Sequence, residues 1–332
     1  PYINNNFDFA EMLSEMLGEL NASHTGCRYY ANGATLSTAA LGVFLDPSYE
    51  GDGLKIKEII KRGPFAVKKN EVTPGSIIEK IDGTDIKAGE DYNALLDGKA
   101  GKNIRLTIKN AKGKRFDLTI KAISQGAQQE LLYKRWVDRN RAIVDSVSHG
   151  RIAYVHVKAM NSESFRTVYS ELLSEKNRTK DAVIVDERHN GGGWLHDDLC
   201  TLLSGKQYQE FVPHGKVVGK DPFNKWTKPS CVLICEDDYS NGHGFPWVYK
   251  ELGIGKLIGA PVAGTMTAVW WETLMDRSLV FGIPQVGCRD MRGTFGENTT
   301  LQPDIEVYNS PEDYITGHDT QLIRAVEEMM KK

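Results

Sequence analysis

Two stretches of this sequence combine residue types that could carry out acyl transfer. Residues 186–194 contain three consecutive glycines, Gly191 to Gly193, directly after an apolar run. Residues 235–243 place Ser240 between another apolar run and a segment with helical periodicity. Consecutive glycines let the backbone turn tightly and direct free N–H groups toward a ligand. A serine at a helix N-terminus lies where partial positive charge favours a developing oxyanion.

The two stretches would complement each other. The backbone N–H of Asn241 is a candidate oxyanion donor, and the triple-glycine turn offers the other. Each stretch also has a purely structural interpretation, because glycines form tight turns and a serine in a polar loop commonly caps a helix. A phosphate site is not indicated, since neither the P-loop nor the dinucleotide-binding glycine pattern is present.

A nucleophilic serine needs a general base. Eight histidines are available, and His243 lies only three positions from Ser240. His156 alternates within an apolar strand and is interpreted as structural. The spacing does not choose among the remaining histidines, because such groups are recognised by their geometry rather than by their order in the chain.

The elements that would position these residues alternate between strand and helix. The expected strands cover 152–157, 182–186 and 232–235, and the expected helices cover 162–175, 194–204 and 244–252. This alternation predicts βαβ units and a largely parallel sheet. Catalytic groups in such sheets collect beyond the carboxyl ends of the strands, which is where both candidate turns lie. Amphipathic helices are expected over 7–20, with Asn6 or Asp8 as the cap, and over 319–332.

Residues 36–123 have a different hydrophobic pattern. Short alternating runs, broken by glycine and proline, predict half-buried antiparallel strands in a small β-rich module. The expected strands cover 41–45, 54–60, 76–81, 104–108 and 116–120. The polar and charged residues 124–150 are expected to form a connecting helix or linker.

Composition narrows the classes of function. The 332 residues carry 41 basic and 44 acidic side chains, so the net charge is −3, which argues against a general nucleic-acid binder. No apolar run is long enough to span a bilayer. The five cysteines form no C-x-x-C pair, and no Cys/His motif suggests a metal, so no metal or cofactor is expected. Cys231 and Cys235, which share one face of a strand, are interpreted as buried small hydrophobic residues.

Residues 36–123 resemble a PDZ domain, with Leu41-Gly42-Val43-Phe44 similar to its carboxylate-binding loop. A PDZ-like module ahead of the motif Asp186-x-Arg188-x-Asn190-Gly-Gly-Gly resembles the C-terminal half of tricorn-type proteases, in the wider class of C-terminal processing peptidases. The resemblance covers nearly the whole chain. It implies an α/β fold, with a parallel-rich crotonase/ClpP-like spiral as the catalytic core and an inserted PDZ-like domain.

The resemblance also implies a domain order. An N-terminal helical segment over 1–35 would carry the general base, and the PDZ-like domain would cover 36–123. A connecting helix or linker would cover 124–150, and the α/β serine peptidase core would cover 151–332.

The resemblance assigns roles to individual residues. Ser240 falls at the nucleophile, His24 at the general base, Ser23 at its supporting serine, and Glu297 at the acid that completes a Ser-His-Ser-Glu tetrad. The oxyanion donors would be the N–H groups of Asn241 and of a glycine of the 191–193 run, Gly193 or Gly192. Leu41, Gly42 and Val43 would bind a peptide segment, and Glu210 falls near an acidic residue that tricorn-type proteases keep for basic side chains.

This sequence departs from the patterns of related families at two places that bear on its chemistry. Tricorn-type sequences usually follow the nucleophile with Asp, whereas this chain has Asn241, so one negative charge beside the site is lost. Processing peptidases that use a Ser-Lys dyad place a lysine in a glycine-rich segment downstream of the serine. Residues 259–267 of this chain contain no lysine, which favours the histidine mechanism.

The resulting expectation is a serine peptidase that hydrolyses oligopeptides or unfolded chains through an acyl-enzyme. The alternative is a catalytically inactive peptide-binding module on the same fold. The resemblance further implies homo-oligomeric assembly and upstream β-propeller domains. The chain starts without Met or a signal pattern, so a fragment of a longer protein is expected, with any targeting segment missing. Its localisation stays unknown, and the resemblance implies a prokaryotic cytoplasm or periplasm.

Overall fold

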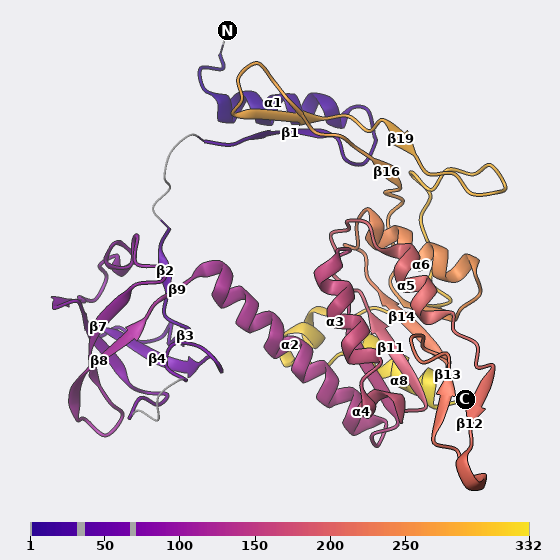
Figure 1. Ribbon diagram of the computed structural model, residues 1–332. Helices are drawn as coiled ribbons and strands as arrows, with labels where there is room; N and C mark the ends of the chain where they lie inside the picture. The colour runs from indigo at the N-terminus through magenta and orange to yellow at the C-terminus, as the bar shows by residue number, and fades with distance from the viewer. Residues whose placement is uncertain (1, 32–36, 67–70, 332) are drawn as a thin grey trace. The chain divides into compact units, whose positions relative to one another are not determined.

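The computed structural model describes residues 2–31, 37–66 and 71–331 (Figure 1). They divide into two compact units. One contains the described residues up to 31 together with those from 140 onward, and the other contains those between 37 and 139. The domain boundary expected between residues 35 and 36 lies outside the described residues.

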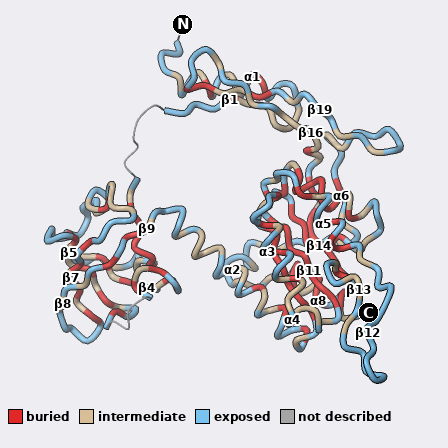
Figure 2. The backbone as a smooth tube through the Cα atoms, in the orientation of Figure 1, coloured by how far each residue is buried: buried red, intermediate tan, exposed pale blue. Residues whose placement is uncertain are grey.

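A five-stranded parallel sheet forms the centre of the first unit. Its strands, in spatial order, are β10 (Ile152–His156), β11 (Ala182–Asp186), β14 (Ser230–Ile234), β15 (Lys256–Gly259) and β20 (Ile305–Glu306). Every neighbouring pair is parallel. All residues of β10, β11 and β14 are buried, as the red tube in Figure 2 shows. The predicted α/β fold with a parallel sheet is therefore confirmed.

Helices cover both faces of this sheet. Helices α3 (Ser162–Leu172), α5 (His196–Leu203) and α6 (Asn241–Glu251) share one apolar cluster with alternate residues of the strands. Helix α8 (Thr320–Met330) contacts β10, β11, β14 and β15 but contributes nothing to that cluster, so it covers the opposite face.

The helix expected over 162–175 is interrupted. Helix α3 ends at Leu172, and the short helix α4 (Glu175–Arg178) begins after Ser174, whose side chain accepts the N–H of Asn177 as an N-cap. The remaining C-terminal helix, α7, covers Pro311–Thr316.

The N-terminal helix α1 (Asn6–Gly18) packs on a small antiparallel sheet. Its strands are β1 (Gly26–Tyr29), β18 (Leu279–Gly282) and β17 (Glu272–Thr273). The Ser14 hydroxyl of α1 accepts the N–H of Cys27 at 2.8 Å and donates to its carbonyl at 2.9 Å. The predicted N-cap of α1, Asn6 or Asp8, was wrong. The cap is Asn5, whose side chain accepts the N–H of Asp8.

Two further pairs of antiparallel strands belong to the first unit. Strands β12 (Gln209–Phe211) and β13 (Gly219–Asp221) pair on either side of the short 3₁₀ helix η2 (Pro213–Gly215). Strands β16 (Thr267–Ala268) and β19 (Val286–Gly287) form the other pair.

The second unit is built from antiparallel strands, as predicted. The order is β3 (Val43–Leu45), β4 (Leu54–Ile59), β5 (Ile77–Ile81), β7 (Asn103–Lys109) and β8 (Arg115–Lys121), with β6 (Thr84–Asp85) paired to β5. Strands β2 (Ala39–Ala40) and β9 (Ile123–Ser124) form a separate pair, and η1 (Tyr92–Leu95) is a short 3₁₀ helix. Helix α2 (Gln125–Val147) occupies the segment expected to connect the two regions.

A buried ion network joins the end of β11 to the start of α8. The Arg188 guanidinium donates to both oxygens of Asp186, at 2.9 and 2.7 Å, and to both oxygens of Asp319, at 2.9 Å each. Asp319 is also the N-cap of α8. Burial would raise the pKa of Asp186, but the charge and hydrogen bonds of Arg188 bring it below its usual value. The network therefore holds the strand end from which the glycine turn departs.

Replacing Arg188 by Met tests this network. We expect the free energy of unfolding to fall by about 3–5 kcal/mol, because Asp186 would keep a buried charge without its partner. Arg151→Met is the matched control. It removes an ion pair to Asp181 in which both side chains are about half exposed, and should cost no more than ~1 kcal/mol. Urea unfolding of both variants gives the comparison, and equal losses would contradict the role given to the network.

Candidate active site

Ser240 lies on a tight turn between β14 and α6. It is the residue before the first turn of α6, and its backbone has φ 57° and ψ −118°. This left-handed conformation is unusual for a residue with a side chain and costs backbone strain. The Ser240 N–H donates to the Thr265 hydroxyl at 2.8 Å, which fixes the turn. The Ser240 side chain makes no capping hydrogen bond, so its hydroxyl remains available to another partner.

That partner is the ring of His24, which lies in the turn between α1 and β1. His24 Nε2 is 2.8 Å from Ser240 Oγ, across 216 positions of sequence. The turn itself is held by the residue before the serine. The His24 N–H donates to the Tyr239 hydroxyl at 2.7 Å, and the two rings lie with centroids 4.9 Å apart.

A chain of hydrogen bonds continues behind the imidazole. His24 Nδ1 lies 2.8 Å from Ser23 Oγ and 2.9 Å from Thr267 Oγ1. Ser23 Oγ donates to Glu297 Oε2 at 2.9 Å, and the Ser23 N–H donates to Glu297 Oε1 at 2.5 Å. The structure thus brings together four residues that the family resemblance singled out, Ser23, His24, Ser240 and Glu297.

The arrangement favours one tautomer of the imidazole. With the proton on Nδ1, the ring donates to Ser23, Ser23 donates to the carboxylate, and Nε2 is left to accept the Ser240 hydroxyl proton. Burial lowers the pKa of His24 below its usual value, and the charge of Glu297 opposes that shift. A neutral ring at neutral pH is the form that can accept a proton.

The three candidate oxyanion donors differ in availability. The Gly192 N–H is already used, because it donates to Asn190 Oδ1 at 2.9 Å. Among the described residues, the N–H groups of Gly193 and Asn241 have no hydrogen-bond partner. Gly192 contributes by its lack of a side chain, since a Cβ there would lie 2.6 Å from the Cβ of Ser240. This close approach leaves no room for another residue type.

The side chain of Asn241 faces the start of α5. Its Oδ1 accepts the N–H groups of Leu195 at 2.8 Å and His196 at 3.1 Å, and its amide donates to His196 Nδ1 at 2.8 Å. The amide donor requires an unprotonated Nδ1, so the His196 ring carries its proton on Nε2. The departure from Asp at this position therefore sets the tautomer of a neighbouring histidine.

The other histidines considered from the sequence have different surroundings. His243 is 1% exposed, and its two ring nitrogens make no hydrogen bond to the described residues. Burial lowers the pKa of His243 to about 4. It lines a separate cavity of about 290 Å³. Its backbone N–H donates to the Ser240 carbonyl at 2.9 Å, but its ring makes no hydrogen bond to the Ser240 hydroxyl. His156 is buried, with Nε2 3.3 Å from the Arg188 carbonyl oxygen.

A cavity of about 360 Å³ opens beside Ser240 and His24. Its other walls combine apolar and polar side chains, and none of the described residues in them is a lysine, an arginine or a carboxylate. The lining residues besides Ser240 and His24 are Gly193, Trp194, His196, Asn241, Trp247, Val248, Thr265, Met266, Thr267, Ala268, Val269 and Cys288.

Glu210 is not part of this cavity wall. It lies in β12, where it forms an ion pair with Lys220 at 3.3 Å and accepts a hydrogen bond from Gln207 at 3.1 Å. The structure does not bring it together with the residues around Ser240, and its role in substrate binding stays a prediction.

The three predicted peptide-binding residues of the second unit, Leu41, Gly42 and Val43, differ in their surroundings. Leu41 and Val43 belong to that unit's apolar core. Gly42 has φ 71°, and its N–H donates to Gln128 Oε1 of α2 at 2.9 Å. A peptide carboxylate would have to displace this side chain to reach the N–H of Gly42. Among the described residues, strand β3 pairs with β4 alone, so it lies at an edge of the described sheet.

Known proteins match both regions of the chain. Residues 151–307 match peptidase family S41, and residues 49–125 match the tricorn protease PDZ domain. Over 99% of its length, the chain is 27% identical to a tricorn protease homolog of Saccharolobus solfataricus. It is 26% identical over its full length to the tricorn protease of Thermoplasma acidophilum. The chain is a tricorn-like member of peptidase family S41. The family indicates a serine-type peptidase.

The tricorn-like chain also has the fold of a solved relative. It superimposes on a crystal structure of the tricorn protease with a TM-score of 0.85, at 24% identity, over 99% of this chain and 33% of that chain. The alignments with the two tricorn relatives named above cover 31% of the length of each relative, so this chain spans about a third of their length. Across the described ranges, none of the helices has the length and apolar character needed to cross a membrane.

Sequence reasoning missed three residues of this tricorn-like site. Thr267 bonds both Ser23 and His24, Thr265 holds the Ser240 backbone, and Tyr239 holds the His24 backbone. Both threonines lie in the segment 259–267, which the sequence analysis inspected only for a lysine. Tyr239 directly precedes Ser240, but nothing in its spacing points to a contact with residue 24.

The partly buried position of His24 predicts the pH at which its ring titrates. We expect its ring to be half-protonated at a pH below the usual value of about 6.5, because burial disfavours the charged form. In Glu297→Gln the midpoint should fall further, since the charge that raises it is removed. NMR titration of the histidine ring signals, with His24→Gln to assign the resonance, gives both values. A midpoint above the usual value would mean that Glu297 outweighs burial.

Proposed function

We propose that this chain hydrolyses peptide bonds in oligopeptides or unfolded chains, with Ser240 as the nucleophile and His24 as the general base. The observation that carries the proposal is the 2.8 Å contact between His24 Nε2 and Ser240 Oγ, backed by the hydrogen bonds from His24 to Ser23 and from Ser23 to Glu297. Nucleophile, base and orienting groups within hydrogen-bond reach are the arrangement that serine catalysis requires.

The proposed reaction begins with proton transfer. His24 Nε2 takes the hydroxyl proton as Ser240 Oγ attacks the carbonyl carbon of the substrate. The charge of the resulting imidazolium is balanced by Glu297 acting through Ser23, and the hydroxyl of Thr267 supports Nδ1 from a second side. The imidazolium then gives its proton to the leaving amine, which leaves an acyl group on Ser240.

The negative oxygen of the intermediate needs donors that are already in place. Gly193 and Asn241 both line the cavity that contains Ser240, and no described residue accepts the N–H group of either one. We assign the oxyanion to this pair rather than to Gly192, because Asn190 already accepts the Gly192 N–H. Preorganised donors of this kind contribute about 2.7–4 kcal/mol each to transition-state stabilisation. Water, activated by His24, completes the cycle by hydrolysing the acyl-enzyme.

The cavity beside Ser240 suggests which side chain the substrate presents. Trp247, Met266 and Val269 supply apolar walls, and among the described residues no lysine, arginine or carboxylate lines the space. We therefore propose that the residue before the scissile bond is apolar. Assembly into a homo-oligomer, the binding of peptide segments by the PDZ domain and the presence of upstream propeller domains remain proposals that follow from the family resemblance.

The alternative is a peptide-binding module without catalytic activity, and a fluorophosphonate probe distinguishes the two. We expect the probe to label wild-type protein and to fail on Ser240→Ala, because only an activated serine reacts with it. His24→Ala should lower kcat/KM for peptide hydrolysis by about 10⁴-fold or more. Peptide turnover and mass spectrometry of the labelled protein give these results.

Matched variants make that experiment decisive. Ser170→Ala changes an exposed serine of α3 and should leave both labelling and turnover intact. His243→Gln tests the other candidate base. Loss of activity in that variant, together with normal turnover in His24→Ala, would assign the role of base to His243. A folded wild-type protein that is never labelled would support the inactive binding module.

Substrate preference follows from the uncharged cavity. Peptides with Phe or Leu before the scissile bond should be cleaved with a kcat/KM at least about 10-fold above those with Lys or Asp there, since a charged side chain would lose its hydration without gaining a partner. Val269→Asp should shift the preference toward Lys, whereas Val218→Asp, which adds the same charge at an exposed position away from the cavity wall, should not. Equal cleavage of all four peptides would contradict the proposal.

A further inference from the structure

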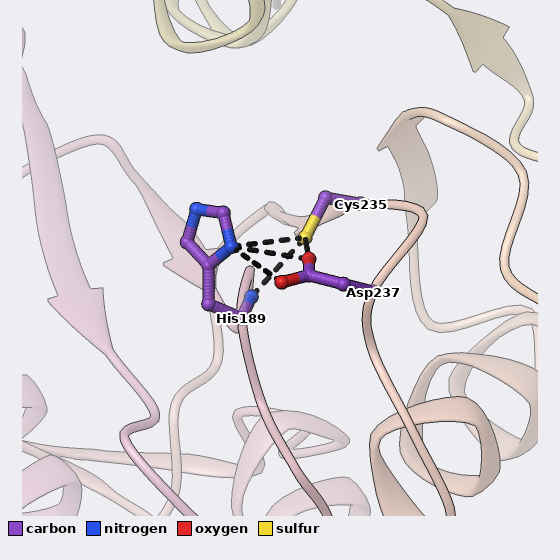
Figure 3. Close-up of side chains that lie close together, drawn as sticks. All are labelled: His189, Cys235 and Asp237. Atoms are coloured by element: carbon purple, nitrogen blue, oxygen red, sulfur yellow. Dashed lines mark hydrogen bonds and ion pairs between the residues drawn. The ribbon is translucent and has the colours of Figure 1, made fainter.

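A second group of reactive side chains lies where β11 and β14 end. His189, Cys235 and Asp237 point toward one another there (Figure 3). Asp237 Oδ1 lies 3.0 Å from His189 Nδ1 and 2.7 Å from Cys235 Sγ, and the sulfur lies 3.8 Å from Nδ1. None of the three belongs to the network around Ser240.

These donors suit one kind of ligand. An imidazole nitrogen, a sulfur and a carboxylate oxygen are the groups that bind Zn²⁺, at about 2.0–2.3 Å from the metal. Tetrahedral coordination at those lengths separates neighbouring donors by roughly 3.4–3.6 Å. The nitrogen–sulfur and nitrogen–oxygen distances are already within about 0.4 Å of this range. The sulfur–oxygen distance must open by about 0.9 Å, which rotation of the Asp237 carboxylate can supply.

The charge of the three donor side chains and their exposure to solvent also suit a divalent cation. A Cys235 thiolate and the Asp237 carboxylate together would carry two negative charges, which equals the charge of the ion. Cys235 is 2% exposed, but the side chains of His189 and Asp237 are 50% and 62% exposed. The donors therefore face solvent on one side, where an ion can enter and keep a water as its fourth ligand.

Hydrogen bonds already fix the backbone around the three donors before any ion binds. The buried Asp238 carboxylate accepts the N–H groups of Asn190 at 3.0 Å and Cys235 at 2.8 Å, which joins the two turns. Tyr239 donates its N–H to the Asn190 carbonyl at 2.9 Å, and His189 donates its own N–H to Cys235 Sγ at 3.1 Å. Preorganised donors lose little conformational freedom when an ion binds.

We propose that His189, Cys235 and Asp237 form a three-ligand site for one Zn²⁺ ion, which ties together the turns that carry Gly193 and Ser240. On binding, the Cys235 thiol releases its proton to solvent, and the proton of His189 moves to Nε2 so that Nδ1 can coordinate. The site differs from the sequence-based expectation of no metal, because its donors come from two separate strand ends and match no spacing motif.

Cobalt substitution tests the site, because Co²⁺ in a zinc site with a thiolate ligand gives a sulfur-to-metal charge-transfer band in the near ultraviolet. Chelator-treated protein without a histidine tag is titrated with Co²⁺ and then with Zn²⁺. We expect one equivalent of Co²⁺ to produce the band, Zn²⁺ to abolish it, and Zn²⁺ to raise the melting temperature. Cys235→Ser should lose the band, and His189→Asn and Asp237→Asn should each weaken binding by at least about 100-fold.

The chain offers matched controls. His149→Asn replaces another exposed histidine with positive φ, and Cys288→Ser replaces another free cysteine; both should bind Co²⁺ like the wild type. Asp237 is exposed, so Asp237→Asn should fold even if Cys235→Ser does not. A folded wild type without the band, or a band that persists in His189→Asn and Asp237→Asn, would overturn the proposal. The measurement reads metal binding alone and does not depend on peptide hydrolysis.

Discussion

The contact between the His24 ring and the Ser240 hydroxyl is the constraint on which the rest of the site depends. It joins an N-terminal turn to a strand end 216 positions away, so neither segment can provide it alone. Helix α1 and strand β1 hold the histidine in place through Ser14, which bonds both backbone groups of Cys27, and through pairing of β1 with β18. The strained backbone of Ser240 holds the other partner. Rigid supports on both sides keep a short hydrogen bond at a fixed geometry.

The turns after β11 and β14 lie side by side because the two strands are parallel neighbours. This places the glycine run against the serine so closely that Gly192 tolerates no side chain, while the N–H of Gly193 stays unpaired among the described residues. Asp238 joins the same turns through two backbone N–H groups. Burial raises the pKa of Asp238 well above its usual value, and the hydrogen bonds from Asn190 and Cys235 oppose that shift. The same pair of turns carries His189, Cys235 and Asp237 on its exposed side.

Asn241, at the position where the family resemblance predicts Asp, holds the start of α5 without adding a charge. An aspartate there could accept from the two N–H groups of α5, and Asn241 still does so through Oδ1. Its amide adds a donor toward His196, whose ring lies with its centroid 5.4 Å from that of Trp194 at the cavity wall. Among the described residues, no lysine, arginine or carboxylate lines the cavity beside Ser240, and the Asn241 side chain holds the start of α5.

The sequence by itself determined the parallel sheet, the antiparallel module, the N-terminal helix and the two strand-end turns, because hydrophobic periodicity and glycine runs report local conformation directly. It also singled out Ser240 as a candidate nucleophile from its place on a strand-end turn, but it reached Ser23, His24 and Glu297 only through resemblance to a family, since spacing did not choose among the histidines. Only the tertiary structure decided which N–H groups are unpaired, that Thr265, Thr267 and Tyr239 support the site, and that Gln128 occupies the N–H of Gly42. These are contacts between segments distant in sequence. Their geometry depends on how the sheets and helices pack, which no local pattern encodes.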